Sequence, residues 1–322
     1  MATIGAGTRP DVTLKLSQLQ NLCKRDPVGY RNEYDAQVRR LKSECHILSL
    51  SPSSRPPPQL SELIQFAAAV SSSSYNEQES KSVSTLLTCL LLGTSHEDNE
   101  NAALNYSENK SLTLPASALA MHRDVRKSCV SALILMRNKG RLPPLQLLEL
   151  FFRLMAIVPD KGLREQLYRH VLNDIRNINK KGKKNDEINR KTQSFLHRVI
   201  SSTVRKQKTG VEVDDATKVA AKRAVDMTSE LYRRKVWTEQ RTVAILASAT
   251  ESILPNVAAA AMRFFLGVED KMADDKDREE QDAWHGVQQI DFHLHSKKTK
   301  VSSLLYMNFF NVHVLIELLS FG

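Results

Sequence analysis

The stretch ALILMRNKGRLPPLQLLELFFRLM, residues 132–155, predicts two apolar helices joined by a tight turn. Gly140 suits the C-terminal end of the first helix, because glycine readily adopts the left-handed backbone conformation that often ends a helix. Pro143 and Pro144 suit the start of the second helix, where the N–H that proline lacks would have no intrahelical partner. We therefore expect this stretch to fold as a helical hairpin.

Apolar residues recur at helical spacing on both sides of this hairpin. Steps of three and four residues place one stripe on a single helix face: Tyr30, Tyr34, Val38, Leu41, Cys45 and Leu48. Further stripes lie within residues 60–70, 83–91, 125–136, 145–155, 163–175, 188–199, 219–231, 243–249 and 257–265, the last ending at Gly267. The sequence lacks the alternating β-branched and aromatic runs that are typical of strands. The pattern predicts an all-α protein.

The composition and the helix spacing narrow the fold class. The 322 residues include only 11 Gly, 11 Pro and 6% aromatics, which favours long runs of helix. Helix pairs recur roughly every 35–45 residues, the period of HEAT and armadillo repeats. We predict a HEAT/armadillo-like helical solenoid over residues 14–267, after a flexible N-terminus at 1–13. A globular helical bundle is the alternative.

Three segments depart from the helical pattern. Residues 93–113 are polar and predict an exposed loop, and residues 268–300 predict a largely disordered linker, acidic at first and then basic. Residues 301–322 form an atypical apolar tail, for which we consider a translated intron or a membrane anchor. The anchor is disfavoured by four polar residues within the run, namely Asn308, Asn311, His313 and Glu317.

Positive charge is the main functional signal. The net charge of +10 and the pI near 9.4 favour an anionic partner, either nucleic acid or an acidic protein. The densest cluster contains Lys180, Lys181, Lys183, Lys184, Arg190 and Lys191. It predicts an RNA-backbone contact or a nuclear localisation signal, and a solvated basic loop is the alternative. The turn of the hairpin carries Arg137, Lys139 and Arg141, which either complete that turn or face a partner.

No pattern in the sequence indicates catalysis. The well-separated Cys23, Cys45, Cys89 and Cys129 predict buried reduced thiols rather than disulfides or a zinc site. A metal site formed by His285, Asp291, His293 and His295 is disfavoured, because no further ligand has suitable spacing. Phosphate-binding glycine loops and hydrolase signatures are missing. We expect a non-enzymatic protein without a cofactor.

Several segments resemble the Sda family of ribosome-biogenesis proteins. They are LQNLCKRDPVGYRNEY (19–34), ALILMRNKG (132–140), LLELFFRLM (147–155), LREQLYRHVLNDIRNINKKGKKN (163–185), SELYRRKVW (229–237) and AAMRFFLG (260–267). The resemblance covers most of residues 14–295 in the same order. The segment WHGVQQIDFHLHSKKTK (284–300) is similar to the plant-type members.

The resemblance implies a non-catalytic nuclear and nucleolar factor for maturation and export of large (60S) ribosomal subunits. Its expected partners are large-subunit precursor particles, meaning rRNA, ribosomal proteins and other assembly factors, with no membrane and no small-molecule substrate. The family has also been linked to actin organisation. Two departures are the longer loop at 93–113 and the apolar tail, where the family continues into a Lys/Arg-rich region. The competing hypothesis is an importin-like helical-repeat adaptor for nucleocytoplasmic transport.

Overall fold

The computed structural model describes residues 15–52, 55–94, 116–180, 184–208 and 213–267, and these ranges contain helices and no strand. The chain divides into two compact units, unit 1 up to Val171 and unit 2 from Leu172. The predicted all-α fold is confirmed. Most of the polar segment 93–113, the N-terminus at 1–13, and the linker and tail at 268–322 lie outside the described residues.

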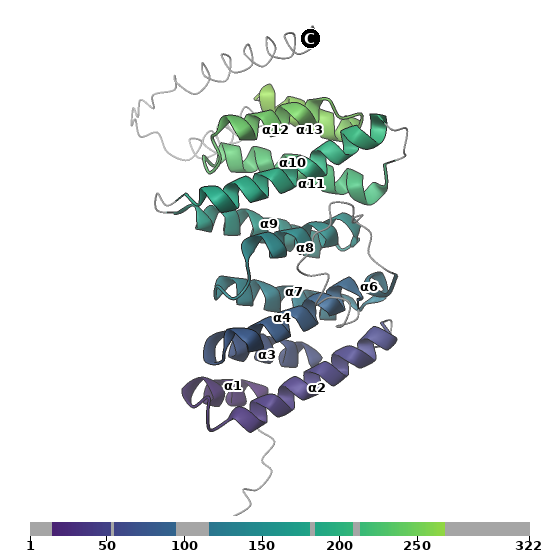
Figure 1. Ribbon diagram of the computed structural model, residues 1–322. Helices are drawn as coiled ribbons and strands as arrows, with labels where there is room; N and C mark the ends of the chain where they lie inside the picture. The colour runs from purple at the N-terminus through teal and green to yellow at the C-terminus, as the bar shows by residue number, and fades with distance from the viewer. Residues whose placement is uncertain (1–14, 53–54, 95–115, 181–183, 209–212, 268–322) are drawn as a thin grey trace, which may run out of the picture. The chain divides into compact units, whose positions relative to one another are not determined.

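Unit 1 is a stack of helices in successive layers (Figure 1). Its helices are α1 (Leu16–Arg25), α2 (Arg31–Leu50), α3 (Leu60–Ser74), α4 (Glu77–Leu92), α6 (Ala116–Ala120), α7 (Arg123–Asn138), α8 (Pro144–Ile157) and the first part of α9 (Lys161–Ile178). The central helix, α3, packs against α1, α2, α4 and α7. It is therefore buried on most of its circumference, from Leu60 at its start to Val70 near its end.

The predicted hairpin is formed by α7 and α8. Gly140 has φ +75°, and the N–H of Arg141 donates to the carbonyl of Met136 at 3.0 Å, so a left-handed glycine ends α7. Pro144 is the first residue of α8. Phe151 and Phe152 of α8 are both fully buried. The expected roles of Gly140 and Pro144 are confirmed.

Unit 2 contains the end of α9 and four further helices, α10 (Asp186–Lys208), α11 (Asp215–Arg233), α12 (Gln240–Thr250) and α13 (Pro255–Phe265). Helix α10 packs on α11 and α12, while α11 and α12 both pack on α13. Trp237, between α11 and α12, is the largest fully buried side chain among the described residues. Each unit thus consists of helices that pack on one another, as α3 does on α7 in unit 1 and α10 on α11 in unit 2. The predicted HEAT/armadillo-like helical class is confirmed.

The structure differs from the sequence analysis near the N-terminus. Helix α1 falls within the predicted helical region, but its bounds were not predicted, because it is only 10 residues long and its buried residues Leu19 and Cys23 form a short stripe. Tyr30 was placed on the stripe of α2 but lies just before that helix and is half-buried. A turn in which the N–H of Gly29 donates to Oδ1 of Asp26 at 2.9 Å separates α1 from α2.

The four cysteines are buried thiols outside any disulfide, as predicted. Burial raises the pKa of the Cys45 thiol to about 12 and also raises that of Cys129. Among the described helices, none is both long enough and apolar enough to cross a bilayer.

Candidate nucleic-acid interface

The predicted basic cluster lies at the connection between α9 and α10. Lys180 follows the end of α9, Lys184 precedes the start of α10, and both are exposed. Lys181 and Lys183 lie outside the described residues. The structure therefore places two of the four lysines, Lys180 at the end of α9 and Lys184 before the start of α10.

The other two predicted residues extend the positive charge along the first turns of α10. Arg190 and Lys191 are both exposed. Nζ of Lys191 lies 2.6 Å from Oε1 of Glu187, and this hydrogen bond and charge lower the pKa of the Glu187 carboxyl. Because the pair is exposed to solvent, the Lys191 ammonium can exchange Glu187 for an external anion at little cost.

A neutral pair of amide side chains holds the base of this turn. Nδ2 of Asn179 donates to Oδ1 of Asn189 at 3.0 Å, and Nδ2 of Asn189 donates to Oδ1 of Asn179 at 2.7 Å. Asn179 also donates to the carbonyl of Ile175 at 2.8 Å. Asn189 is buried, so these bonds are protected from competition with water. The pair therefore fixes the end of α9 against the first turn of α10, on either side of the basic turn.

A third partner connects this base to another turn of unit 2. Nε1 of Trp237 donates to Oδ1 of Asn189 at 3.1 Å, although 48 residues separate the two in the chain. Trp237 belongs to the connection between α11 and α12. This bond places the α11–α12 connection beside the first turn of α10, at one end of unit 2.

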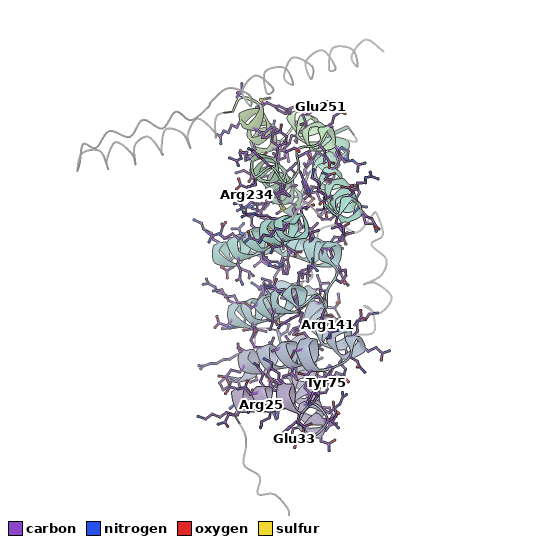
Figure 2. The ribbon with its side chains drawn as sticks, turned by 90° about the vertical axis from the view of Figure 1, so that its left-hand side faces the viewer. Arg25, Glu33, Tyr75, Arg141, Arg234 and Glu251 are labelled. Carbon is purple, nitrogen blue, oxygen red and sulfur yellow. The ribbon has the colours of Figure 1, made fainter. Side chains whose placement is uncertain are left out.

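The α11–α12 turn is itself basic, with three consecutive cations, Arg233, Arg234 and Lys235, all exposed. Figure 2 labels Arg234 in a view that faces this end of the unit. Nε of Arg234 lies 2.7 Å from Oε1 of Glu230, and Nη2 of Arg233 lies 2.8 Å from Oε2 of the same carboxylate. One carboxylate is thus shared between two guanidinium groups, and exposed Lys235 adds a third positive charge to the turn.

Lys235 has an unusual backbone conformation. Its φ is +57°, the one positive value at a residue other than glycine in the described part of the chain. The N–H of Lys235 donates to the carbonyl of Tyr232 at 2.9 Å, and that of Val236 donates to Leu231 at 3.0 Å. These two bonds form a Schellman motif, whose left-handed position is usually glycine.

The two basic turns suit phosphate recognition better than base recognition. Lysine and arginine neutralise phosphates, whereas proteins that hold single strands also provide aromatic side chains on which bases stack. The aromatic residues of the described parts of these turns are not available for stacking: Trp237 is buried, and half-buried Tyr232 contacts Phe264 with ring centroids 5.1 Å apart. The arrangement therefore favours contact with a nucleic-acid backbone.

Other predicted residues have different surroundings. At the α7–α8 turn of unit 1, Nη1 of Arg137 donates to the carbonyl of Leu142, and Nε of Arg141 donates to that of Ser72, both at 3.0 Å. These contacts favour the interpretation in which the two arginines complete the turn. His285, Asp291, His293 and His295, considered for metal binding, lie outside the described residues.

Sequence reasoning did not identify six residues of this interface, namely Asn179, Asn189, Arg233, Arg234, Lys235 and Trp237. The signal for the second turn is the run of three cations at residues 233–235, two residues after Leu231, the last buried apolar residue of α11. Nothing in the sequence pairs this run with residues 180–184, because the pairing depends on how α11 and α12 pack on α10.

Stacked helices with basic turns between them define the class of this protein, an all-helical repeat protein with a candidate nucleic-acid interface. The sequence model of the family described as SDA1, HEAT repeat, matches residues 101–304, which include both basic turns. The chain belongs to the SDA1 family, and the resemblance to the Sda family is confirmed. This is a family of ribosome-biogenesis proteins.

Curated relatives extend the match towards the N-terminus. The chain is 33% identical over 256 residues to the protein SDA1 homolog of Xenopus tropicalis. This match covers 80% of this chain and 31% of that protein. It is 31% identical over 271 residues to the homolog of Nematostella vectensis, covering 82% of this chain and 34% of that protein. It is 30% identical over 263 residues to the protein sda1 of Schizosaccharomyces pombe, and this match covers 80% of this chain and 33% of that protein. The chain thus spans about a third of the length of these relatives.

Proposed function

We propose that this chain acts as a non-catalytic factor in the maturation of large (60S) pre-ribosomal subunits and in their nuclear export. Its place of action is the nucleus and nucleolus, and its partners are rRNA, ribosomal proteins and other assembly factors. Membership of the SDA1 family carries this proposal, because the family match includes the basic turns that could contact rRNA.

The physical basis of this function is scaffolding. Stacked helices bury one face against each neighbour and leave the turns and helix edges exposed along the stack. Exposed cations such as Lys180 and Lys184 bind phosphates without any charge being buried in the protein. A chain of this kind holds a particle in one conformation or blocks the arrival of the next factor, and it needs no cofactor or reacting group.

The test is to express the 322-residue chain with a tag in cells, isolate it gently, and analyse the RNA and proteins that accompany it. We expect enrichment of large-subunit precursor rRNA and of large-subunit assembly factors. If the chain instead recovers a small GTPase in a nucleotide-dependent manner and no precursor rRNA, it is an importin-like transport adaptor and the proposal is wrong.

The role of the first basic turn is tested in the same cells by changing Lys180, Lys181, Lys183 and Lys184 to Gln. A matched control changes four exposed cations of unit 1 to Gln, namely Lys24, Arg25, Arg39 and Lys42. We expect the first variant to lose precursor rRNA and the control to keep it. Imaging of both variants separates the two hypotheses for the turn. A variant that remains nuclear but loses RNA supports the RNA contact, and one excluded from the nucleus supports a localisation signal.

A further inference from the structure

We infer that two groups of exposed cations, Lys180 and Lys184 between α9 and α10 and Arg233, Arg234 and Lys235 between α11 and α12, form one bipartite surface for the phosphate backbone of a double-helical RNA. In this surface, Lys235 keeps a strained backbone so that its ammonium group faces the RNA. This inference rests on the proposed function and specifies the partner and the residues of its nucleic-acid interface.

The two turns are held together by the core of unit 2. Asn189 accepts hydrogen bonds from Asn179, next to the first turn, and from Trp237, just after the second. Both donors are within 3.1 Å of the same oxygen, and Asn189 and Trp237 are buried. The separation between Lys184 and Lys235 is therefore set by the packed core of unit 2. Two groups of cations held at a fixed separation lose little conformational entropy when they bind a rigid partner.

Lys235 occupies a backbone position that other helix ends in this chain fill with glycine. The same left-handed position at the ends of α4, α7 and α13 is occupied by glycine, namely Gly93 at φ +64°, Gly140 at +75° and Gly267 at +61°. A side chain is disfavoured there, because its Cβ comes too close to the following carbonyl. A residue held in a disfavoured backbone conformation suggests a function for its side chain. Glycine would complete the α11 cap equally well, but it would not provide a charge.

The side chains that the two turns expose favour one type of nucleic acid. Double-helical RNA hides its base faces and presents phosphates and 2′-hydroxyls, so proteins recognise its shape and charge. Single strands are held by aromatic stacking in addition to charge. The two turns provide exposed lysines and arginines, and Tyr232 and Trp237 are engaged in packing. This combination fits the backbone of an RNA helix.

The test measures binding of the full 322-residue chain to an RNA duplex of about 16 base pairs, long enough to present two successive minor grooves. Fluorescence anisotropy is followed at several salt concentrations between about 50 and 200 mM. The key variant is Lys235→Gly. It should weaken duplex binding by about three- to tenfold and reduce the slope of log affinity against log salt by about one. The same substitution should raise the thermal unfolding midpoint by about 1–3 °C, because it removes the backbone strain.

Three controls separate charge from structure. Lys235→Arg keeps the charge and should bind the duplex as the unchanged chain does. Lys235→Asn tolerates the left-handed conformation without a charge and should bind as weakly as Lys235→Gly. Lys24→Gln in unit 1 removes one exposed cation outside the surface and should leave the affinity unchanged.

Three outcomes would overturn the inference. The first is unchanged duplex affinity and salt slope for Lys235→Gly. The second is equal binding of the duplex and of an oligouridine strand, which would indicate a general single-strand site. The third is displacement of the duplex by polyglutamate at equal charge concentration, which would point to an acidic protein partner.

The inference and the proposed function fail separately. If the tagged chain recovers large-subunit precursors but Lys235→Gly leaves duplex affinity unchanged, only the bipartite surface is wrong. If duplex affinity depends on Lys235 but the chain recovers no large-subunit precursors, only the proposed function is wrong.

Discussion

Asp160 joins the start of α9 to the start of α7 through Arg123, within unit 1. Its Oδ2 lies 2.7 Å from Nε of Arg123, the first residue of α7. Its Oδ1 accepts the N–H groups of Gly162 at 3.0 Å and Leu163 at 3.2 Å, in the first turn of α9. Asp160 is thus both the N-cap of one helix and the ion-pair partner of another.

These contacts predict a loss of stability in acid. Burial alone would raise the pKa of Asp160, but the hydrogen bond from Leu163 and the charges of Arg123 and Lys127 outweigh it and lower the pKa below its ordinary 3.8. A carboxyl whose pKa is lower in the folded chain stabilises the fold at pH values above its unfolded pKa. That contribution is lost as the pH falls through the folded pKa.

Asp160→Ala should therefore cost about 1 kcal/mol at neutral pH, the usual cost of losing an N-cap. The measurement is urea unfolding, monitored by circular dichroism. It is made at pH 7 and at pH values below the pKa of the Asp160 carboxyl in the unfolded chain. The difference between the variant and the unchanged chain should shrink at the acidic end. A difference that stays constant across this range would contradict the role given to the Asp160 charge.

The amide pair at the base of the basic turn predicts a larger effect. Asn189→Ala leaves the buried Nε1–H of Trp237 and the amide of Asn179 without their acceptor. An unsatisfied buried polar group costs about 1–3 kcal/mol, so we expect a destabilisation of about 2–3 kcal/mol. Tryptophan fluorescence during urea unfolding provides the measurement. Exposed Asn177, on the same α9, is the matched control, and Asn177→Ala should change the stability by less than about 0.5 kcal/mol.

The buried cysteines should be unreactive in the folded chain. Thiol reagents attack the thiolate, and burial raises the pKa of Cys45 to about 12 and that of Cys129 in the same direction. An aromatic disulfide reagent at about pH 8, below the ordinary thiol pKa, should therefore react slowly until denaturant is added, and then with all four thiols. Rapid reaction of the folded chain would show that these thiols are accessible, contrary to the structure.

Replacing a buried apolar residue of α8 should lower the free energy of unfolding far more than replacing an exposed one of α2. Phe152 is 0% exposed in the core of unit 1, and Leu50, at the end of α2, is 72% exposed. Phe152→Ala should destabilise the chain by about 3–5 kcal/mol, because it removes buried surface and leaves a cavity. Leu50→Ala should have an effect within about 0.5 kcal/mol. Calorimetric unfolding of both variants gives the comparison, and similar losses for the two would contradict the packing of α8.

Helical periodicity was sufficient to predict most of the fold. Helices with long stripes, such as α3 and α11, were predicted because their apolar residues repeat over several turns. The bounds of α1 were not predicted, because a stripe of Leu19 and Cys23 is too short to define where a helix begins and ends. The glycine-capped end of α7 was predicted because Gly140 is a local signal. The cap of α11 was not, because Lys235 carries no such signal.

Only half of the candidate site could be predicted from the sequence. The exposure of Lys180 and Lys184 follows from their place between two helical stripes, which is local information. The bond between Trp237 and Asn189 joins residues 48 apart, and it depends on the packing of α10, α11 and α12. A single sequence contains no direct record of such a contact, so the second turn was seen only in the structure.

The Asn179–Asn189–Trp237 cluster is made of neutral groups, while the surface it supports is made of charged ones. Amide and indole groups do not titrate near neutral pH, and mobile ions barely screen hydrogen bonds between uncharged, buried partners. The positions of the two turns therefore do not depend on the pH or salt conditions that change the electrostatic attraction of their side chains. An RNA could be released by a rise in ionic strength while the two turns remain in place, ready for the next RNA without any refolding.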